Sequence, residues 1–148
     1  MPAIVLCASA APFIAIVVRL VAAGYRRPGA KRDDARAGAL EVLRRGARRE
    51  KDPPAGSLLR RALGVVHAAG SLSTLPRAVA GWAEDGVLGL RWEGVPGCTG
   101  CTARFHDDSV ELVATGEDGA VVRTTMVGDE ARVGAWLAGA LRRGLRPL

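Results

Sequence analysis

The sequence predicts an α+β protein with an N-terminal transmembrane helix, a helical segment, and a four-stranded antiparallel sheet packed by a C-terminal helix. Three observations predict this class. An uncharged apolar run lies near the N-terminus, apolar residues recur at helical spacing, and residues between Val87 and Val127 alternate with a period of two. The 148 residues divide into an anchor (1–25), a basic juxtamembrane helix and linker (26–55), and a small α+β domain (56–148).

The first element is an apolar segment, of which Ala3–Val18 carries no charge. As a helix continued to Tyr25 it would be about 34 Å long, enough to cross a hydrocarbon core of about 30 Å. In a second interpretation, residues 3–25 form a buried strand and helix of the core. That interpretation needs parallel partner strands, which the following segment does not supply. We favour a single-pass membrane anchor, with the C-terminal domain on the cytosolic face at synthesis.

Positive charge follows the apolar segment. Between Arg19 and Arg61 there are 13 basic and five acidic residues, a net charge of +8, whereas Ala62–Leu148 carries −2. No aromatic residue lies among these arginines after Tyr25, so we expect no nucleic-acid binding. The predicted membrane-proximal basic residues are Arg19, Arg26, Arg27, Lys31 and Arg32.

Three helices are predicted next. Asp33–Asp52 has a narrow apolar stripe and many arginines, which fits a solvated spacer better than a helix lying on an anionic membrane. Leu58–Ala69, capped by Ser57, has a broad apolar face. Leu75–Glu84 is expected to be a short helix with Pro76 near its start.

After a turn at Asp85-Gly86, four strands are expected: Val87–Glu93, Thr102–His106, Ser109–Thr115 and Ala120–Val127. Asp129 then caps a final helix, whose apolar face should pack across the sheet. The predicted packing core comprises Trp92, Phe105, Val133, Trp136, Leu137 and Leu141.

A Cys-x-x-Cys lies in "GVPGCTGCTARFHDD". Cys98, Cys101 and His106 have the spacing of three zinc-knuckle ligands, but the fourth position is Glu111 instead of cysteine. A thioredoxin-like site needs its second cysteine in a helix, which this sequence does not predict. We interpret the segment as a loop between strands, with a possible local disulfide between Cys98 and Cys101, and we expect no metal.

No catalytic motif stands out. The sequence has no phosphate-binding glycine loop and no nucleophile elbow. His67 is expected at a helix boundary, and Asp107-Asp108 in a turn. We therefore expect a protein that is not an enzyme and has no cofactor and no small-molecule substrate.

Parts of the chain resemble one small subunit of the poxvirus entry-fusion complex. The likeness is carried by "YRRPGAK" (25–31), "VLRRGARREKDPP" (42–54), and the strand-turn-strand-helix ending at 103–141. It covers about half of the chain, and the segment Leu75–Gly100 departs from the pattern. The C-terminal part also looks like uncharacterised bacterial α+β domains with a "GxLxLxW" strand, here Gly86–Trp92.

The viral resemblance implies a non-enzymatic virion membrane protein, held by its N-terminus and bound to other subunits during membrane fusion and cell entry. The alternative is a soluble cytosolic bacterial α+β binding or regulatory protein.

Overall fold

The computed structural model describes residues 29–49 and 56–145. The expected membrane helix, together with Arg19, Arg26 and Arg27, lies outside these residues. In the part that is described, no helix is long and apolar enough to cross a membrane. Residues Lys31–Leu148 form one compact unit. This unit includes the helix that the sequence assigned to a separate juxtamembrane segment.

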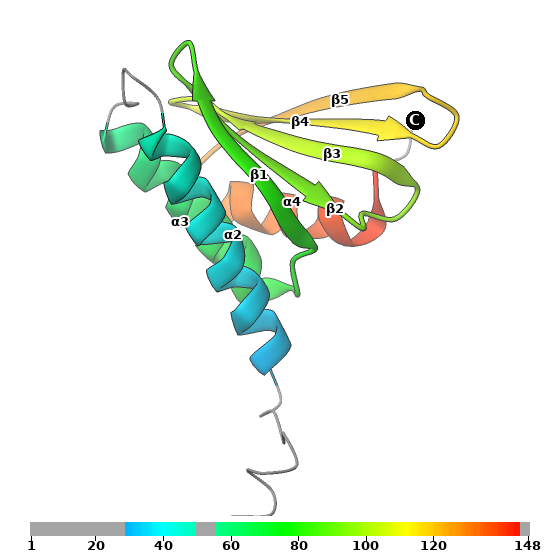
Figure 1. Cartoon of the computed structure of the whole chain (residues 1–148), viewed down its shortest axis with the longest axis horizontal. Coiled ribbons are helices and arrows are strands. Elements are labelled where there is room, and N and C mark those ends of the chain that lie inside the picture. The colour runs from blue at the N-terminus through cyan, green and yellow to red at the C-terminus, as the bar shows by residue number, and fades with distance from the viewer. Residues whose placement is uncertain (1–28, 50–55, 146–148) are drawn as a thin grey trace, which may run out of the picture. The chain divides into compact units, whose positions relative to one another are not determined.

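Three helices pack on one face of a sheet (Figure 1). Helix α2 spans Ala30–Arg48, α3 spans Gly56–Leu72, and α4 spans Glu130–Arg143. α2 is not a solvated spacer, because Ala39 and Leu43 are at most 1 % exposed. Its narrow apolar stripe is sufficient because the surface that it covers is itself built from small residues.

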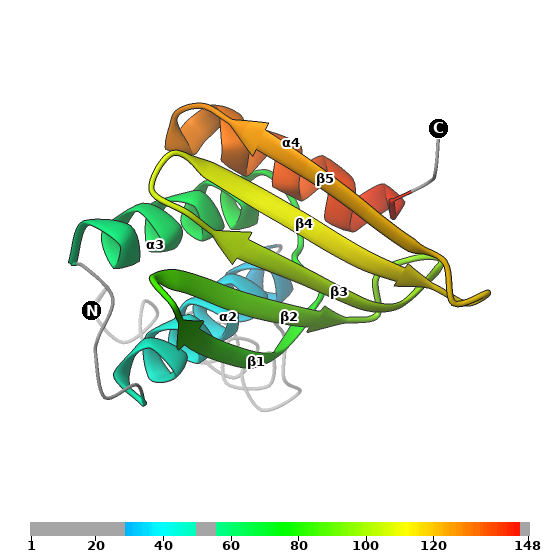
Figure 2. The ribbon, with the colours of Figure 1, turned by 90° about the horizontal axis from the view of Figure 1, so that it is seen from above.

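The α+β class is confirmed, but the sheet has five strands instead of four. The strands are β1 (Arg77–Glu84), β2 (Val87–Glu93), β3 (Cys98–Phe105), β4 (Ser109–Gly116) and β5 (Val121–Val127). They form an antiparallel meander in which spatial order equals sequence order (Figure 2). Four of these strands correspond to the predicted ones, although β3 begins at Cys98, four residues earlier than expected.

The fifth strand corrects the prediction of a helix over Leu75–Glu84, where the structure has β1. The turn after it explains the strand. Asp85 and Gly86 both adopt positive φ, 49° and 74°, as a tight hairpin turn between antiparallel strands requires. β1 then pairs with β2 in a ladder that runs from Glu84↔Val87 to Arg77↔Glu93. Long-range pairing thus overrides the helical propensity of the alanines in β1.

Helix α2 and strand β1 meet backbone to backbone. A Cβ on Gly46 would overlap the carbonyl group of Gly81 and lie 2.6 Å from Trp82 N. A Cβ on Gly81 would lie 2.5 Å from the Val42 carbonyl oxygen. Glycine on both sides is therefore what allows α2 to approach this edge of the sheet.

The C-terminal helix follows the sequence prediction. The Asp129 side chain accepts a hydrogen bond of 2.8 Å from the Arg132 backbone N–H, which satisfies one free donor of the first turn. Val133, Leu137 and Leu141 are at most 2 % exposed. The helix also crosses α3 closely, since a Cβ on Gly134 would lie 2.6 Å from the Ala68 Cβ.

Candidate functional site

No described helix covers the face of the sheet opposite α2, α3 and α4, here called the open face (Figure 2). Register places alternate side chains of all five strands on it. Its central side chains are those of Trp82, Arg91, Thr102, Arg104, Glu111, Val113 and Arg123.

An ion-pair cluster lies on the open face. Glu111 is flanked by Arg104 on β3 and Arg123 on β5, with nitrogen–oxygen distances of 3.5 and 3.4 Å. The Glu111 side chain is 19 % exposed, whereas those of Arg104 and Arg123 are 44 and 62 % exposed. One carboxylate is thus shared by two arginines, which leaves donors of both guanidinium groups directed to solvent. These donors could bind acidic or carbonyl groups, and exposed ion pairs of this kind contribute little to stability.

Two glycines of the open face are covered by long side chains. A Cβ on Gly89 would overlap the indole of Trp82, its partner across the β1–β2 ladder. A Cβ on Gly100 would lie 3.4 Å from Nη2 of Arg91. The indole and the guanidinium group are therefore held flat along the sheet, a geometry in which aromatic and arginine side chains bind partner surfaces.

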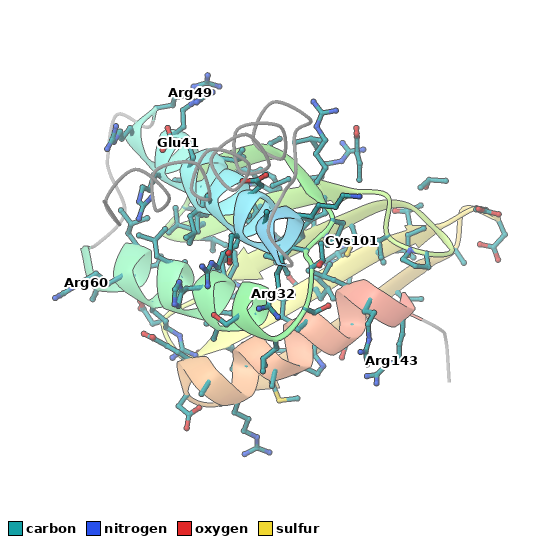
Figure 3. The ribbon with its side chains drawn as sticks, turned by 90° about the horizontal axis from the view of Figure 1, so that it is seen from below. Arg32, Glu41, Arg49, Arg60, Cys101 and Arg143 are labelled. Carbon is teal, nitrogen blue, oxygen red and sulfur yellow. The ribbon has the colours of Figure 1, made fainter. Side chains whose placement is uncertain are left out.

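The outer surface of α2, α3 and α4, here called the helical layer, carries more positive charge than the open face. Arginines point outward from it, among them Arg49 just after α2, Arg60 on α3 and Arg143 on α4 (Figure 3). The other exposed arginines of this layer are Arg32, Arg44, Arg45, Arg48, Arg132 and Arg142. Lys31 and Arg32, which the sequence placed next to the membrane, lie exposed in the first turn of α2. The layer therefore presents a basic surface, in contrast to the mixed charges of the open face.

The two cysteines of the Cys-x-x-Cys lie in strand β3 and not in a loop. The ladder pairs Cys98 with Gly116 and Cys101 with Ala114, and an irregularity at Thr99 shifts the register between them. The cysteines therefore stand two partner positions apart, about 6.6 Å, on the covered face. Both are free thiols. A Cα spacing of about 6.6 Å lies within the range that disulfides span, so the possible bridge between Cys98 and Cys101 stays a prediction.

The third member of the proposed zinc spacing is not nearby. His106 follows the other end of β3, where its backbone N–H donates to the Ser109 carbonyl at 2.9 Å. Among the described residues, no group of three or more His, Cys, Asp or Glu side chains is placed to hold a metal ion. The spacing of Cys98, Cys101 and His106 therefore does not translate into a metal site in this sheet.

Burial makes Cys101 chemically inert. Burial in the core, and to a smaller extent a neighbouring Cys98 thiolate, raises the pKa of Cys101 from 9.0 to about 12. We expect iodoacetamide at pH 8 to alkylate Cys98 in the folded protein and to leave Cys101 unmodified, because Cys101 is buried and its raised pKa keeps it protonated. Peptide mass spectrometry measures this. Equal labelling of the two residues without denaturant would contradict their placement.

A cavity of about 370 Å³ lies at the end of the sheet. It is lined by the β2–β3 loop, the β4–β5 hairpin and the C-terminal end of α4, including Cys98, Glu117, Asp118 and Arg143. Arg143 is exposed there (Figure 3). The cavity opens between the β2–β3 loop and the β4–β5 hairpin. We assign it no chemistry.

The residues proposed as a packing core lie under the sheet. Trp92, Phe105, Val133 and Leu137 are 0 % exposed and Leu141 is 2 % exposed, whereas Trp136 is half-buried against them. His67 is exposed on α3. The alternation of the predicted strands indicates one wet face of the sheet, but Trp82 and Arg77 were not placed on it, because they were assigned to a helix. The turn at Asp85-Gly86 was the signal that could have placed them, since such turns join two strands.

Comparison with known protein families, with curated proteins and with solved structures finds no match to this chain.

Proposed function

We propose that this chain is a non-enzymatic, membrane-anchored subunit that binds other proteins of a multiprotein complex through its open face. The observation that carries the proposal is the asymmetry of the compact unit. The three helices that the structure describes lie on one side of the sheet, and the other side carries Trp82 and exposed, paired arginines. An uncovered face of this composition is typical of interaction surfaces.

The basic helical layer supports membrane attachment. α2 begins at Ala30, so in the sequence its exposed basic residues Lys31 and Arg32 follow closely on the apolar segment. Exposed arginines near an anionic leaflet contribute about 1 kcal/mol each to attraction. A helical layer that faces the membrane would leave the open face directed away from it, toward neighbouring subunits.

The resemblance to a small subunit of the poxvirus entry-fusion complex suggests the context. In that context the partners are other membrane proteins of the virion, and the process is membrane fusion during entry into the host cell. The proposal needs neither a cofactor nor a small-molecule substrate.

Reversing one charge on the open face tests the proposal. We expect Arg91→Glu to reduce about tenfold the amount of hetero-oligomeric complex recovered with the full chain from native membranes in mild detergent. The reason is that a central arginine typically contributes more than about 1.4 kcal/mol to an interface. Blue-native electrophoresis with mass spectrometry of the bands measures the complex.

Arg60→Glu is the matched control, because Arg60 is equally exposed but lies on α3. It should leave the complex intact. The proposal is wrong if the wild-type chain migrates without other proteins, or if both substitutions have the same effect.

A further inference from the structure

Strand β5 is an unprotected edge of the sheet. It pairs with β4 alone, and no described residue pairs with its other side. Its sequence, VVRTTMV, has one charge, no proline and no irregularity in its ladder. Val121 and Val127 are 57 and 61 % exposed. Natural sheets usually protect such an edge with charges, prolines or bulges, so an unprotected one calls for a pairing partner.

The backbone of β5 shows which groups are available. The Ala120 carbonyl accepts a hydrogen bond of 2.8 Å from Gly116 N–H, so the backbone of Ala120 is turned toward β4. Alternation along an antiparallel strand then directs the backbone polar groups of Val122, Thr124 and Met126 toward β4 as well. The N–H and C=O groups of Val121, Arg123, Thr125 and Val127 are therefore directed at the free edge.

We propose that β5 pairs with β5 of a second copy of this chain, antiparallel and centred on Thr124, so that the two sheets become one continuous sheet. In this register Val121 lies opposite Val127 of the other copy, Val122 opposite Met126, Arg123 opposite Thr125, and Thr124 opposite itself. Every apolar side chain meets an apolar one, and β-branched residues meet across the strands. All the outward backbone groups named above gain a hydrogen-bond partner.

The neighbouring registers are worse. Centring the pairing on Arg123 would place the two Arg123 side chains directly opposite each other, which is destabilising. Centring it on Thr125 would place Arg123 opposite Val127 and leave Val121 without an apolar partner. Only in the Thr124 register does each of the two exposed valines lie opposite an apolar residue of the other copy. In that register each Arg123 also stays paired with Glu111 of its own chain.

Helix α4 carries an apolar side chain, Trp136, near the free edge of β5. Gly134 faces α3, and residues two positions apart on a helix point about 160° away from each other. Trp136 therefore projects from α4 on the side away from α3, where β5 lies above the helix (Figure 2). In a single chain, Trp136 and Met126 are both half-buried. Pairing would bring two such tryptophans close to the two-fold axis and remove them further from water.

This inference does not depend on membrane anchoring or on the open face. A disulfide test in the full chain isolates it. Thr124 would form a pair that shares no hydrogen bonds with its own copy, with Cα atoms about 4.5 Å apart, a distance that a disulfide can bridge. We expect Thr124→Cys, oxidised with copper phenanthroline, to give a disulfide-linked homodimer on a non-reducing gel.

Thr125→Cys is the matched control, because Thr125 would stand diagonal to its own copy and should remain at the background of the wild-type cysteines. Adding Val127→Lys to Thr124→Cys should reduce the dimer at least about threefold, whereas Ala80→Lys at the opposite edge should not. Equal cross-linking of Thr124→Cys and Thr125→Cys would overturn the inference. So would a wild-type chain that stays monomeric in sedimentation equilibrium at about 100 μM, where weak specific pairing is still detectable.

Discussion

Replacing Gly46 by alanine is expected to lower the free energy of unfolding by about 2–3 kcal/mol. The new methyl group would overlap the backbone of Gly81 and crowd Trp82 N at 2.6 Å. Backbone atoms of a paired strand cannot rotate away as a side chain can, so α2 would have to move off β1. The gain in helix propensity, about 1 kcal/mol, offsets only part of this cost. Urea denaturation followed by far-ultraviolet circular dichroism measures the change.

Gly38 on the same helix provides the control. A Cβ there meets no atom within 4 Å, so Gly38→Ala should stabilise the protein by about 0.5–1 kcal/mol through helix propensity alone. Opposite signs for the two substitutions would locate the effect in the contact between α2 and β1. If both substitutions stabilised the protein, the close approach of helix and strand would be disproved.

Trp92→Ala is expected to cost about 3–5 kcal/mol. Trp92 is 0 % exposed at the end of β2, next to Cys101 on β3. Its removal leaves a cavity that the flanking strands cannot close, because the ladder on both sides fixes their spacing. The same urea titration reports this loss. A cost below about 1 kcal/mol would contradict the placement of Trp92 in the core.

Trp92→Phe separates the contribution of aromatic packing to stability from that of the indole N–H. The indole N–H of Trp92 is buried and has no hydrogen-bond partner in the described part of the chain. Phenylalanine removes that unsatisfied donor while it keeps an aromatic ring, so the cost should be about 1–2 kcal/mol. A loss as large as that of Trp92→Ala would indicate that the indole N–H is satisfied by a bound water.

Much of the fold follows from local sequence signals. The period-two segments predicted β2, β4 and β5 almost to the residue, because the burial of successive side chains alternates along each strand. Asp129 predicted the start of α4 because it can cap a helix, and the apolar residues after it recur at helical spacing. These elements carry their own caps, turns and patterns, so a single sequence is enough to find them.

Strand β1 could not be predicted in this way. Ala78, Ala80 and Gly81 have little strand propensity, and their conformation is imposed by β2 on one side and by α2 on another. Their small side chains allow β1 to approach α2, which is distant in the sequence. The β1 part of the open face was missed for this reason, since Trp82 and Arg77 acquire their positions only when β1 pairs with β2.

The cysteine pair was misplaced for a related reason. The glycines and proline of Gly94–Gly97 suggested that the loop continued to Cys101, but the irregularity at Thr99 lets β3 begin at Cys98. One inserted residue in a ladder moves two cysteines to the same face. No local pattern in the sequence predicts such an insertion.

Carbonate extraction of membranes, applied to the full chain and to a chain that lacks residues 1–25, decides between the anchored and the soluble interpretation. We expect the full chain to stay in the membrane pellet. We expect the truncated chain to appear in the supernatant and to unfold in one cooperative transition, since the buried core of the described residues runs from Ala39 to Leu141. Release of the full chain by carbonate, or aggregation of the truncated chain, would contradict the proposal that residues 1–25 anchor a domain that folds without them.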